Sequence, residues 1–202
     1  DGGTGTDGGT GTDGGTGTDG GTTGGDPEPP PREDPRRAVT IARRVSGGWS
    51  DMLTLFNEVP IRSVGVSPDS GKAVLIHTAH PEGGTAPWSY TLLDLTRATP
   101  IKKIQRVEAL PGAILFTPDG SRAAVLLRDD AASIRKTDLV DLSNFIVQSL
   151  LLGSPPQGVG YVDTTAKIFV SQEHGSGRIT FVGADGQVQT VTGFELNDAV
   201  KD

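Results

Sequence analysis

Cysteine is absent from this chain of 202 residues, which excludes disulfide bonds and thiolate metal ligands and is compatible with any compartment. Long apolar runs are also missing, and no stretch approaches the roughly 18 consecutive apolar residues of a membrane-spanning helix. No segment keeps the apolar period of an amphipathic helix, about 3.6 residues, beyond two turns. We therefore predict no transmembrane segment and no helical domain.

The N-terminal tail contains no apolar side chain that could form a core. Residues 1–25 repeat the hexapeptide DGGTGT and end in DGGTTGG, and PEPPPREDP follows at 27–35. Because glycine has the largest ordering cost of any residue, we expect a flexible coil followed by an extended proline-rich spacer. Such tethers often follow the lipidated cysteine of exported bacterial lipoproteins, and by this analogy we consider an upstream lipid anchor.

A calcium-binding tail is the alternative. Residues 2–10, GGTGTDGGT, match the first six positions of the GGxGxDxUx repeat of calcium-binding β-rolls. However, Gly9 occupies the apolar position of that motif, and the period is six residues instead of nine. Without the apolar side chain no roll core forms, so we predict a linker and no cofactor.

The acidity of the chain is confined to the tail. Residues 1–34 hold eight of the 25 acidic residues and one of the 18 basic residues, which accounts for the whole net charge of −7. The remaining body is neutral and has no basic surplus to attract phosphate. This charge balance argues against nucleic acid as a partner.

Three segments of the body repeat one pattern, at intervals of 50 and then 45 residues. They are VGVSPDSGKAVLIH (64–77), ILFTPDGSRAAVLL (114–127) and VGYVDTTAKIFVSQ (159–172). Pro68 and Asp69 match Pro118 and Asp119, whereas the third copy lacks the Pro-Asp pair. A repeat of about 40–50 residues is typical of a propeller blade of four strands.

Each repeat divides into four short strands separated by turn residues. In the second repeat we expect strands at 112–117, 122–128, 133–142 and 145–152. The sequence PDGS at 118–121 provides the first turn, and DLSN at 141–144 provides the last.

The SPDG-type strand-turn-strand followed by a DL turn resembles the bacterial YVTN/WD-repeat-like β-propellers, over about residues 61–194. The resemblance implies an all-β fold, a β-propeller-like array of four-stranded antiparallel blades in an incomplete ring, behind a disordered tail. The expected domains are a linker at 1–35 and a propeller-like domain at 36–202. Its blades fall at about 61–108, 109–153 and 154–196, with a partial blade at 38–60.

The number of blades is too small for a closed ring. Propellers close with about four to eight blades, and this body holds three and part of a fourth. We expect the chain to be part of a longer protein. The alternative is a ring that closes with other chains.

Candidate site residues lie in the loops between second and third strands. Because strands alternate in direction, these loops share one edge with the connections between blades, and the resemblance implies that this edge binds ligands. The candidates are His77, His80, Glu82, Arg128, Asp129, Asp130, Glu173 and His174.

Two sharper hypotheses compete with simple ligand binding at this edge. A metal site is one, but His77 and His80 would point to opposite faces of a strand, so we predict no metal. Catalysis is the other, but a GxSxG nucleophile elbow and a phosphate-binding loop are both missing, so we name no catalytic residue.

These observations predict a non-catalytic binding or scaffold propeller of the bacterial cell envelope, whose loop-lined face binds an unidentified protein or small molecule. The expected location is outside the cytoplasm: periplasmic, anchored to the outer membrane, or extracellular. A propeller-type enzyme or metal-binding domain is the first alternative, and a surface adhesion or self-association module is the second.

Overall fold

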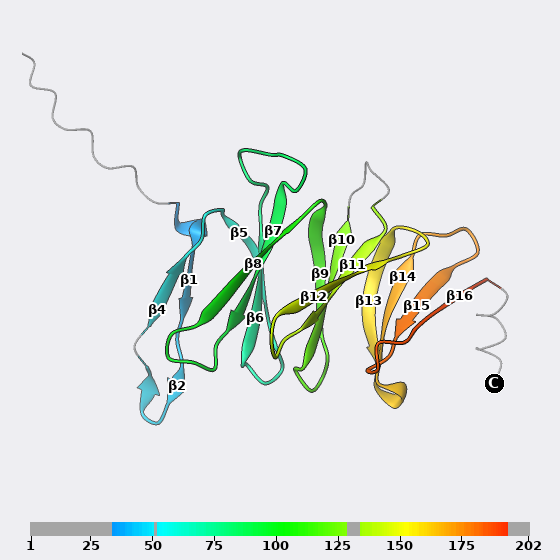
Figure 1. Ribbon diagram of the computed structural model, residues 1–202. Coiled ribbons are helices and arrows are strands. Elements are labelled where there is room, and N and C mark those ends of the chain that lie inside the picture. Colours follow the sequence, from blue (N-terminus) through cyan, green and yellow to red (C-terminus); the bar gives the residue numbers. More distant parts are fainter. Residues whose placement is uncertain (1–33, 51, 129–133, 194–202) are drawn as a thin grey trace, which may run out of the picture. The chain divides into compact units, whose positions relative to one another are not determined.

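The computed structural model describes residues 34–50, 52–128 and 134–193. They belong to one compact unit that extends over residues 33–202. Three four-stranded antiparallel sheets follow one another along this unit, accompanied by two two-stranded sheets (Figure 1). The prediction of an all-β, propeller-like array with an unclosed ring is therefore confirmed. Of the predicted tail at 1–35, residues 1–33 lie outside the described residues, and Pro35 begins a short 3₁₀ helix.

The chain order within each large sheet is also the spatial order. The first sheet holds β5 (Ile61–Val66), β6 (Lys72–His77), β7 (Trp88–Asp94) and β8 (Ile101–Val107). The second holds β9 (Leu110–Phe116), β10 (Arg122–Arg128), β11 (Lys136–Asp141) and β12 (Ile146–Leu151). The third holds β13 (Pro156–Val162), β14 (Lys167–Gln172), β15 (Arg178–Val182) and β16 (Val188–Thr192).

The segment before the first large sheet forms only two-stranded pairs. β1 (Ala38–Ile41) pairs with β4 (Leu53–Phe56), and the hairpin of β2 (Arg44–Val45) and β3 (Gly48–Trp49) lies between them in the chain. A short 3₁₀ helix, η1 (Pro35–Arg37), leads into β1.

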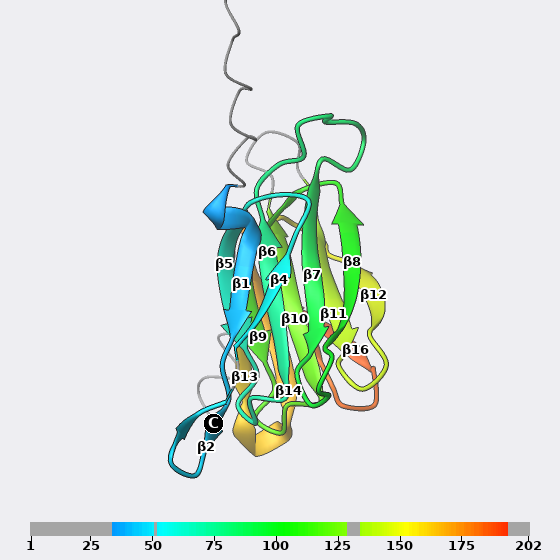
Figure 2. The ribbon, with the colours of Figure 1, turned by 90° about the vertical axis from the view of Figure 1, so that its left-hand side faces the viewer.

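The second strands of the first two large sheets, β6 and β10, are apolar on both faces, because other sheets lie against both sides of them. In β6, Val74 and Ile76 join the core shared with the second sheet, whereas Ala73 and Leu75 pack toward β1 and β4. Successive side chains of a strand point to opposite faces, so an unbroken apolar run serves two cores. Figure 2 shows β1 and β4 lying over this face of the first sheet.

The turn between first and second strands uses the same side-chain bonds in the first two sheets. Ser67 Oγ donates to Asp69 Oδ1 at 2.5 Å, and Thr117 Oγ1 donates to Asp119 Oδ1 at 2.6 Å. These hydrogen bonds, with backbone amides that also donate to the carboxylates, lower the pKa of both aspartates. In the third sheet Val162 has no hydroxyl at this position, and the chain forms the 3₁₀ helix η2 (Asp163–Thr165) instead.

Candidate functional site

The connections between second and third strands lie on the opposite side of the sheets from the aspartate turns. They comprise residues 78–87 and 173–177 and, of the second connection, the described residues 134–135, and we call this side the loop edge (Figure 1). The connections between the large sheets, at 108–109 and 152–155, reach the same edge because each of these sheets contains four antiparallel strands, and residues 57–60 reach it because they lead into β5. The loop edge thus gathers segments from all three repeats.

Four of the predicted site residues are exposed at this edge. They are Glu82, Arg128, Glu173 and His174. His174 accepts a weak hydrogen bond at Nδ1 from the backbone amide of Ser176, at 3.3 Å. Asp129 and Asp130 lie outside the described residues. The exposed four come from three different sheets and carry both signs of charge.

His77 and His80 are placed differently, inside the first sheet. Their exposed fractions are 2% and 6%. His77 Nε2 bonds to Thr91 Oγ1 at 2.8 Å, and His80 Nε2 bonds to Ser89 Oγ at 2.9 Å. Burial lowers the pKa of both imidazoles, so both rings favour the neutral form. The hydrogen bonds of the two histidines thus fasten β6 and the loop after it to β7, and both rings are buried.

The structure does not bring the histidines of the first and third sheets together. His174 is exposed beyond β14, whereas His77 and His80 lie beside Asn57, Glu58 and Val59 within the first sheet. Among residues 34–50, 52–128 and 134–193, no three His, Cys, Asp or Glu side chains are placed to hold one metal ion. The same residues contain no helix long and apolar enough to cross a membrane.

A polar position on the third strand recurs in every repeat, and sequence reasoning missed it. Thr91, Asp138 and Thr180 are opposite Leu75, Val125 and Val170, which are equivalent positions of the second strands. All three are almost fully buried. The sequence signal was a polar residue followed by two apolar residues in each third strand, namely TLL, DLV and TFV.

The partners of this polar position show that the first and third repeats are built alike. Gln172 is the repeat equivalent of His77, and its Nε2 donates to Thr180 Oγ1 at 2.6 Å, as His77 pairs with Thr91. In the second repeat the equivalent residue is Leu127, and Asp138 instead accepts from Ser149 Oγ at 2.6 Å. We conclude that His77 holds a structural position of the repeat.

Comparison with known proteins gives no relative by sequence. No family model matches the chain, and no curated protein matches it. Similar solved structures exist, and all those named here share only 11–16% of their residues with this chain.

A hydrazine synthase from Kuenenia stuttgartiensis superposes with a TM-score of 0.50 at 16% identity, over 77% of this chain and 44% of that one. A 6-phosphogluconolactonase-like protein from Bacteroides uniformis gives 0.48 at 11% identity, over 78% and 49%. TolB from Acinetobacter baumannii gives 0.42 at 12% identity, over 76% and 40%. The chain spans less than half the length of each, and at this identity the likeness concerns the fold alone. The chain therefore has a β-propeller-like fold whose ring the described residues do not close.

Proposed function

We propose that this chain is a non-catalytic binding or scaffold domain of the bacterial cell envelope, and that the loop edge contacts a protein partner. The observation that carries the proposal is the exposure of Glu82, Arg128, Glu173 and His174 on loops of three consecutive sheets. Binding does not require a catalytic group in these loops. The rigid sheets hold several loops on one side, where together they can contact a partner.

The buried polar groups support a scaffold role over a catalytic one. His77, Asp138 and Gln172 each bond to a neighbouring side chain within the sheets. Catalytic groups need a partner and an accessible substrate position about 3 Å away, and these side chains are enclosed. The side chains of Glu82, Glu173 and His174 at the loop edge, by contrast, are exposed.

Envelope location is the less direct part of the proposal. It rests on the acidic Gly/Thr/Asp tail, whose composition suits a flexible spacer between an anchor and a folded domain.

Photocrosslinking from single positions tests the loop edge. A crosslinking residue is placed at 82 or 173 on the loop edge, and at 164 or 185 on the opposite edge as matched exposed controls. With a bacterial envelope extract we expect one discrete protein adduct from positions 82 and 173 only. Glu173→Lys should lower the yield of the adduct from position 82 at least about threefold, and Glu82→Lys should do the same for the adduct from position 173. Equal adducts from both edges, or none from the loop edge, would contradict the proposal.

A further inference from the structure

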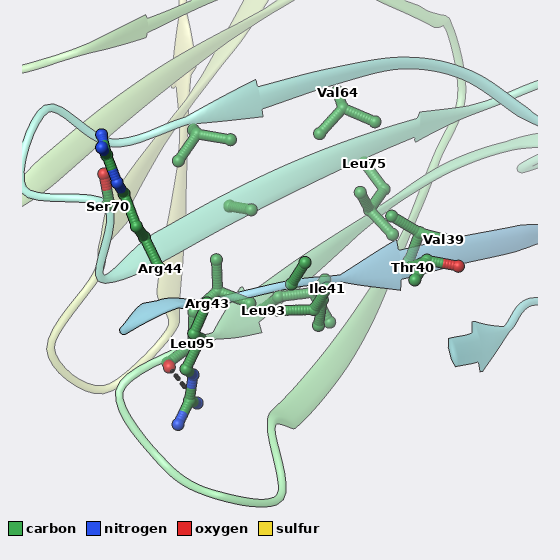
Figure 3. Close-up of a pocket in the computed structure, with 13 residues that line it drawn as sticks. Val39, Thr40, Ile41, Arg43, Arg44, Val64, Ser70, Leu75, Leu93 and Leu95 are labelled. Carbon is green, nitrogen blue, oxygen red and sulfur yellow. Dashed lines mark hydrogen bonds between the residues drawn. The ribbon is translucent and has the colours of Figure 1, made fainter. Parts of the chain in front are cut away.

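An apolar groove lies between β1 and the first large sheet, far from the loops discussed above. Its volume is about 530 Å³, and it is lined on one side by residues 39–44 and on the other by Val64, Val66, Leu75 and Leu93 (Figure 3). Val64 and Val66 are 50% and 51% exposed, and both belong to β5, the edge strand of the first large sheet that lies beside the groove. This β1 groove is a surface that the loop-edge proposal does not use.

The other two large sheets show what covers the residues equivalent to Val64 and Val66. Ile114 and Phe116 are the counterparts of Val64 and Val66 in the second sheet, and both pack into the core between the first and second sheets. There they lie against Gly65 of β5, at which a Cβ would be 3.2 Å from Ile114 and 3.1 Å from Phe116.

The next junction repeats this arrangement. Val159 and Tyr161 are the counterparts in the third sheet, and they pack with Leu115 of β9. At both junctions between large sheets, therefore, the first strand of the preceding sheet covers the two residues equivalent to Val64 and Val66. At the β1 groove the preceding sheet has only two described strands, and the pair is half exposed.

β1 also presents an unpaired edge on the side of the groove. Its described strand partner is β4 alone. The helix η1, which leads into β1, contacts β5. On the other side, Lys102 of β8 donates from Nζ to the carbonyl oxygen of Phe56 in β4, at 3.5 Å. The free edge of β1 is thus the one nearer β5. Unpaired backbone groups on such an edge are a template for another strand.

The tail of this chain is chemically unsuited to fill the β1 groove. Residues 1–33 consist only of Asp, Gly, Thr, Pro, Glu and Arg, and they contain no aliphatic or aromatic side chain. An occupant must instead offer apolar side chains on one face of a strand, as β9 does with Leu115 at the junction between the second and third sheets.

We propose that the β1 groove binds an extended segment of a partner polypeptide by strand addition to β1. The segment pairs with the free edge of β1 and places apolar side chains, two residues apart, on Val64 and Val66. Main-chain hydrogen bonds supply affinity in this mode, and the pockets for alternate side chains supply specificity.

A dye-labelled peptide with the sequence of residues 110–121, LPGAILFTPDGS, is the probe, because β9 covers the equivalent pair in this structure. Fluorescence anisotropy measures its binding to the full chain. We expect saturable binding that the double variant Val64→Lys/Val66→Lys weakens at least tenfold. Val188→Lys, at a β16 position of similar exposure (48%), should leave the affinity unchanged. A peptide of the same composition in scrambled order should not bind.

Disulfide trapping gives a second measurement with the groove intact. The chain has no cysteine, so Thr40→Cys, at the exposed position of β1, introduces a single thiol. Peptides with cysteine at successive positions should form the mixed disulfide with a period of two residues, as expected for a paired strand.

Three results would overturn the proposal: unchanged affinity in the folded Lys variant, equal binding of the scrambled peptide, or trapping without a period. A discrete dimer of the full chain that the Lys variant dissociates would assign the groove to a second copy instead. Binding of a fatty acid without binding of the peptide would assign it to a small apolar ligand. Both assignments also overturn the proposal.

Discussion

Tyr90 donates a hydrogen bond from its hydroxyl to Asp138 Oδ2 at 2.8 Å, and this bond joins the third strands of two neighbouring sheets. Both residues are fully buried. Burial, followed by the charge of Asp138, raises the pKa of Tyr90 far above its usual value, so the hydroxyl keeps its proton. Since Ser149 binds the other oxygen of Asp138 at 2.6 Å, both oxygens of the buried carboxyl group are satisfied.

Tyr90→Phe tests how much this contact stabilises the junction. The variant removes the donor and leaves a buried carboxyl oxygen without its partner, so we expect the free energy of unfolding to fall by about 1–3 kcal/mol. Urea denaturation followed by circular dichroism measures the change. Tyr161→Phe, in the core between the second and third sheets, is the matched control and should change stability by less than about 0.5 kcal/mol. Unchanged stability of the Tyr90 variant would contradict this account.

His77→Gln tests the pH dependence that follows from histidine burial. An unfolded histidine has a pKa of about 6.5, and burial lowers the pKa of His77 in the folded state. The unfolded chain therefore binds the proton more readily, and stability is complete above about pH 6.5 and falls as the pH decreases below it. Glutamine removes this contribution and can keep the bond to Thr91, because Gln172 makes the equivalent bond to Thr180.

The measurement for His77→Gln is the free energy of unfolding at several pH values between about 5 and 8. We expect a shallower decline toward low pH than in the wild type. Some decline should remain, because burial lowers the pKa of His80 as well. His174→Gln, at an exposed site, serves as the control and should retain the wild-type slope.

Asp94→Asn tests the acid limit of the fold. Thr96 donates to Asp94 Oδ1 from its hydroxyl at 2.6 Å and from its amide at 3.0 Å, and Lys72 lies 3.0 Å from Oδ2. These contacts lower the pKa of Asp94 to about 2. The stabilisation is therefore complete above the unfolded value of about 3.9 and is lost as the pH falls toward 2.

The unfolding free energy between about pH 4 and 2 should decline less steeply in the Asp94→Asn variant than in the wild type. The variant should also be less stable at neutral pH, because the bond to Lys72 loses its charge. Asp163→Asn, on the exposed η2, is the control for removing an acidic residue. If the unfolding free energy of the wild type and of Asp94→Asn declines equally toward low pH, the carboxylate of Asp94 does not contribute to acid unfolding and this prediction is wrong.

Ser70→Gly tests a strained turn that the repeat itself identifies. Ser70 has a φ of 59°, and its equivalent in the second repeat, Gly120, has a φ of 68°. Side chains other than glycine avoid this left-handed region at a cost of about 1 kcal/mol. We expect Ser70→Gly to raise the free energy of unfolding by about 0.5–1 kcal/mol.

The reverse change, Gly120→Ser, should destabilise by a similar amount or more, because its Cβ would lie 3.0 Å from Asp69 Oδ1. Thermal unfolding of the two variants provides the comparison. Shifts of the same sign in both would refute the assignment of strain to this turn position.

The strand pattern was predictable because it depends on local chemistry. The PDSG and PDGS turns, the apolar second strands and the interval of the repeat predicted four-stranded antiparallel sheets, and the structure contains them. The predicted third strand of the second repeat, 133–142, is shorter in the structure, where β11 begins at Lys136. Residue 133 itself lies outside the described residues.

The positions of the histidines were not predictable in the same way. His77 ends an apolar strand and His80 follows it in a polar loop, so sequence alone placed both at the ligand-binding edge. Whether such a side chain is exposed or buried depends on whether a neighbouring strand provides a hydrogen-bond partner inside the sheet. Here Thr91 and Ser89 of β7 offer hydroxyl partners inside the sheet. Asp138 is the converse case, since one of its two carboxyl oxygens is satisfied by Tyr90 from another sheet.

By itself, the sequence determined the all-β class, the repeat and the turns, because strand alternation and turn residues act over a few neighbouring positions. Only the tertiary structure decided which polar side chains are enclosed and which are presented, and that Val64 and Val66 lie half exposed. These outcomes depend on packing between sheets, which joins residues some 50 positions apart. Burial is a property of that packing, and no local pattern encodes it.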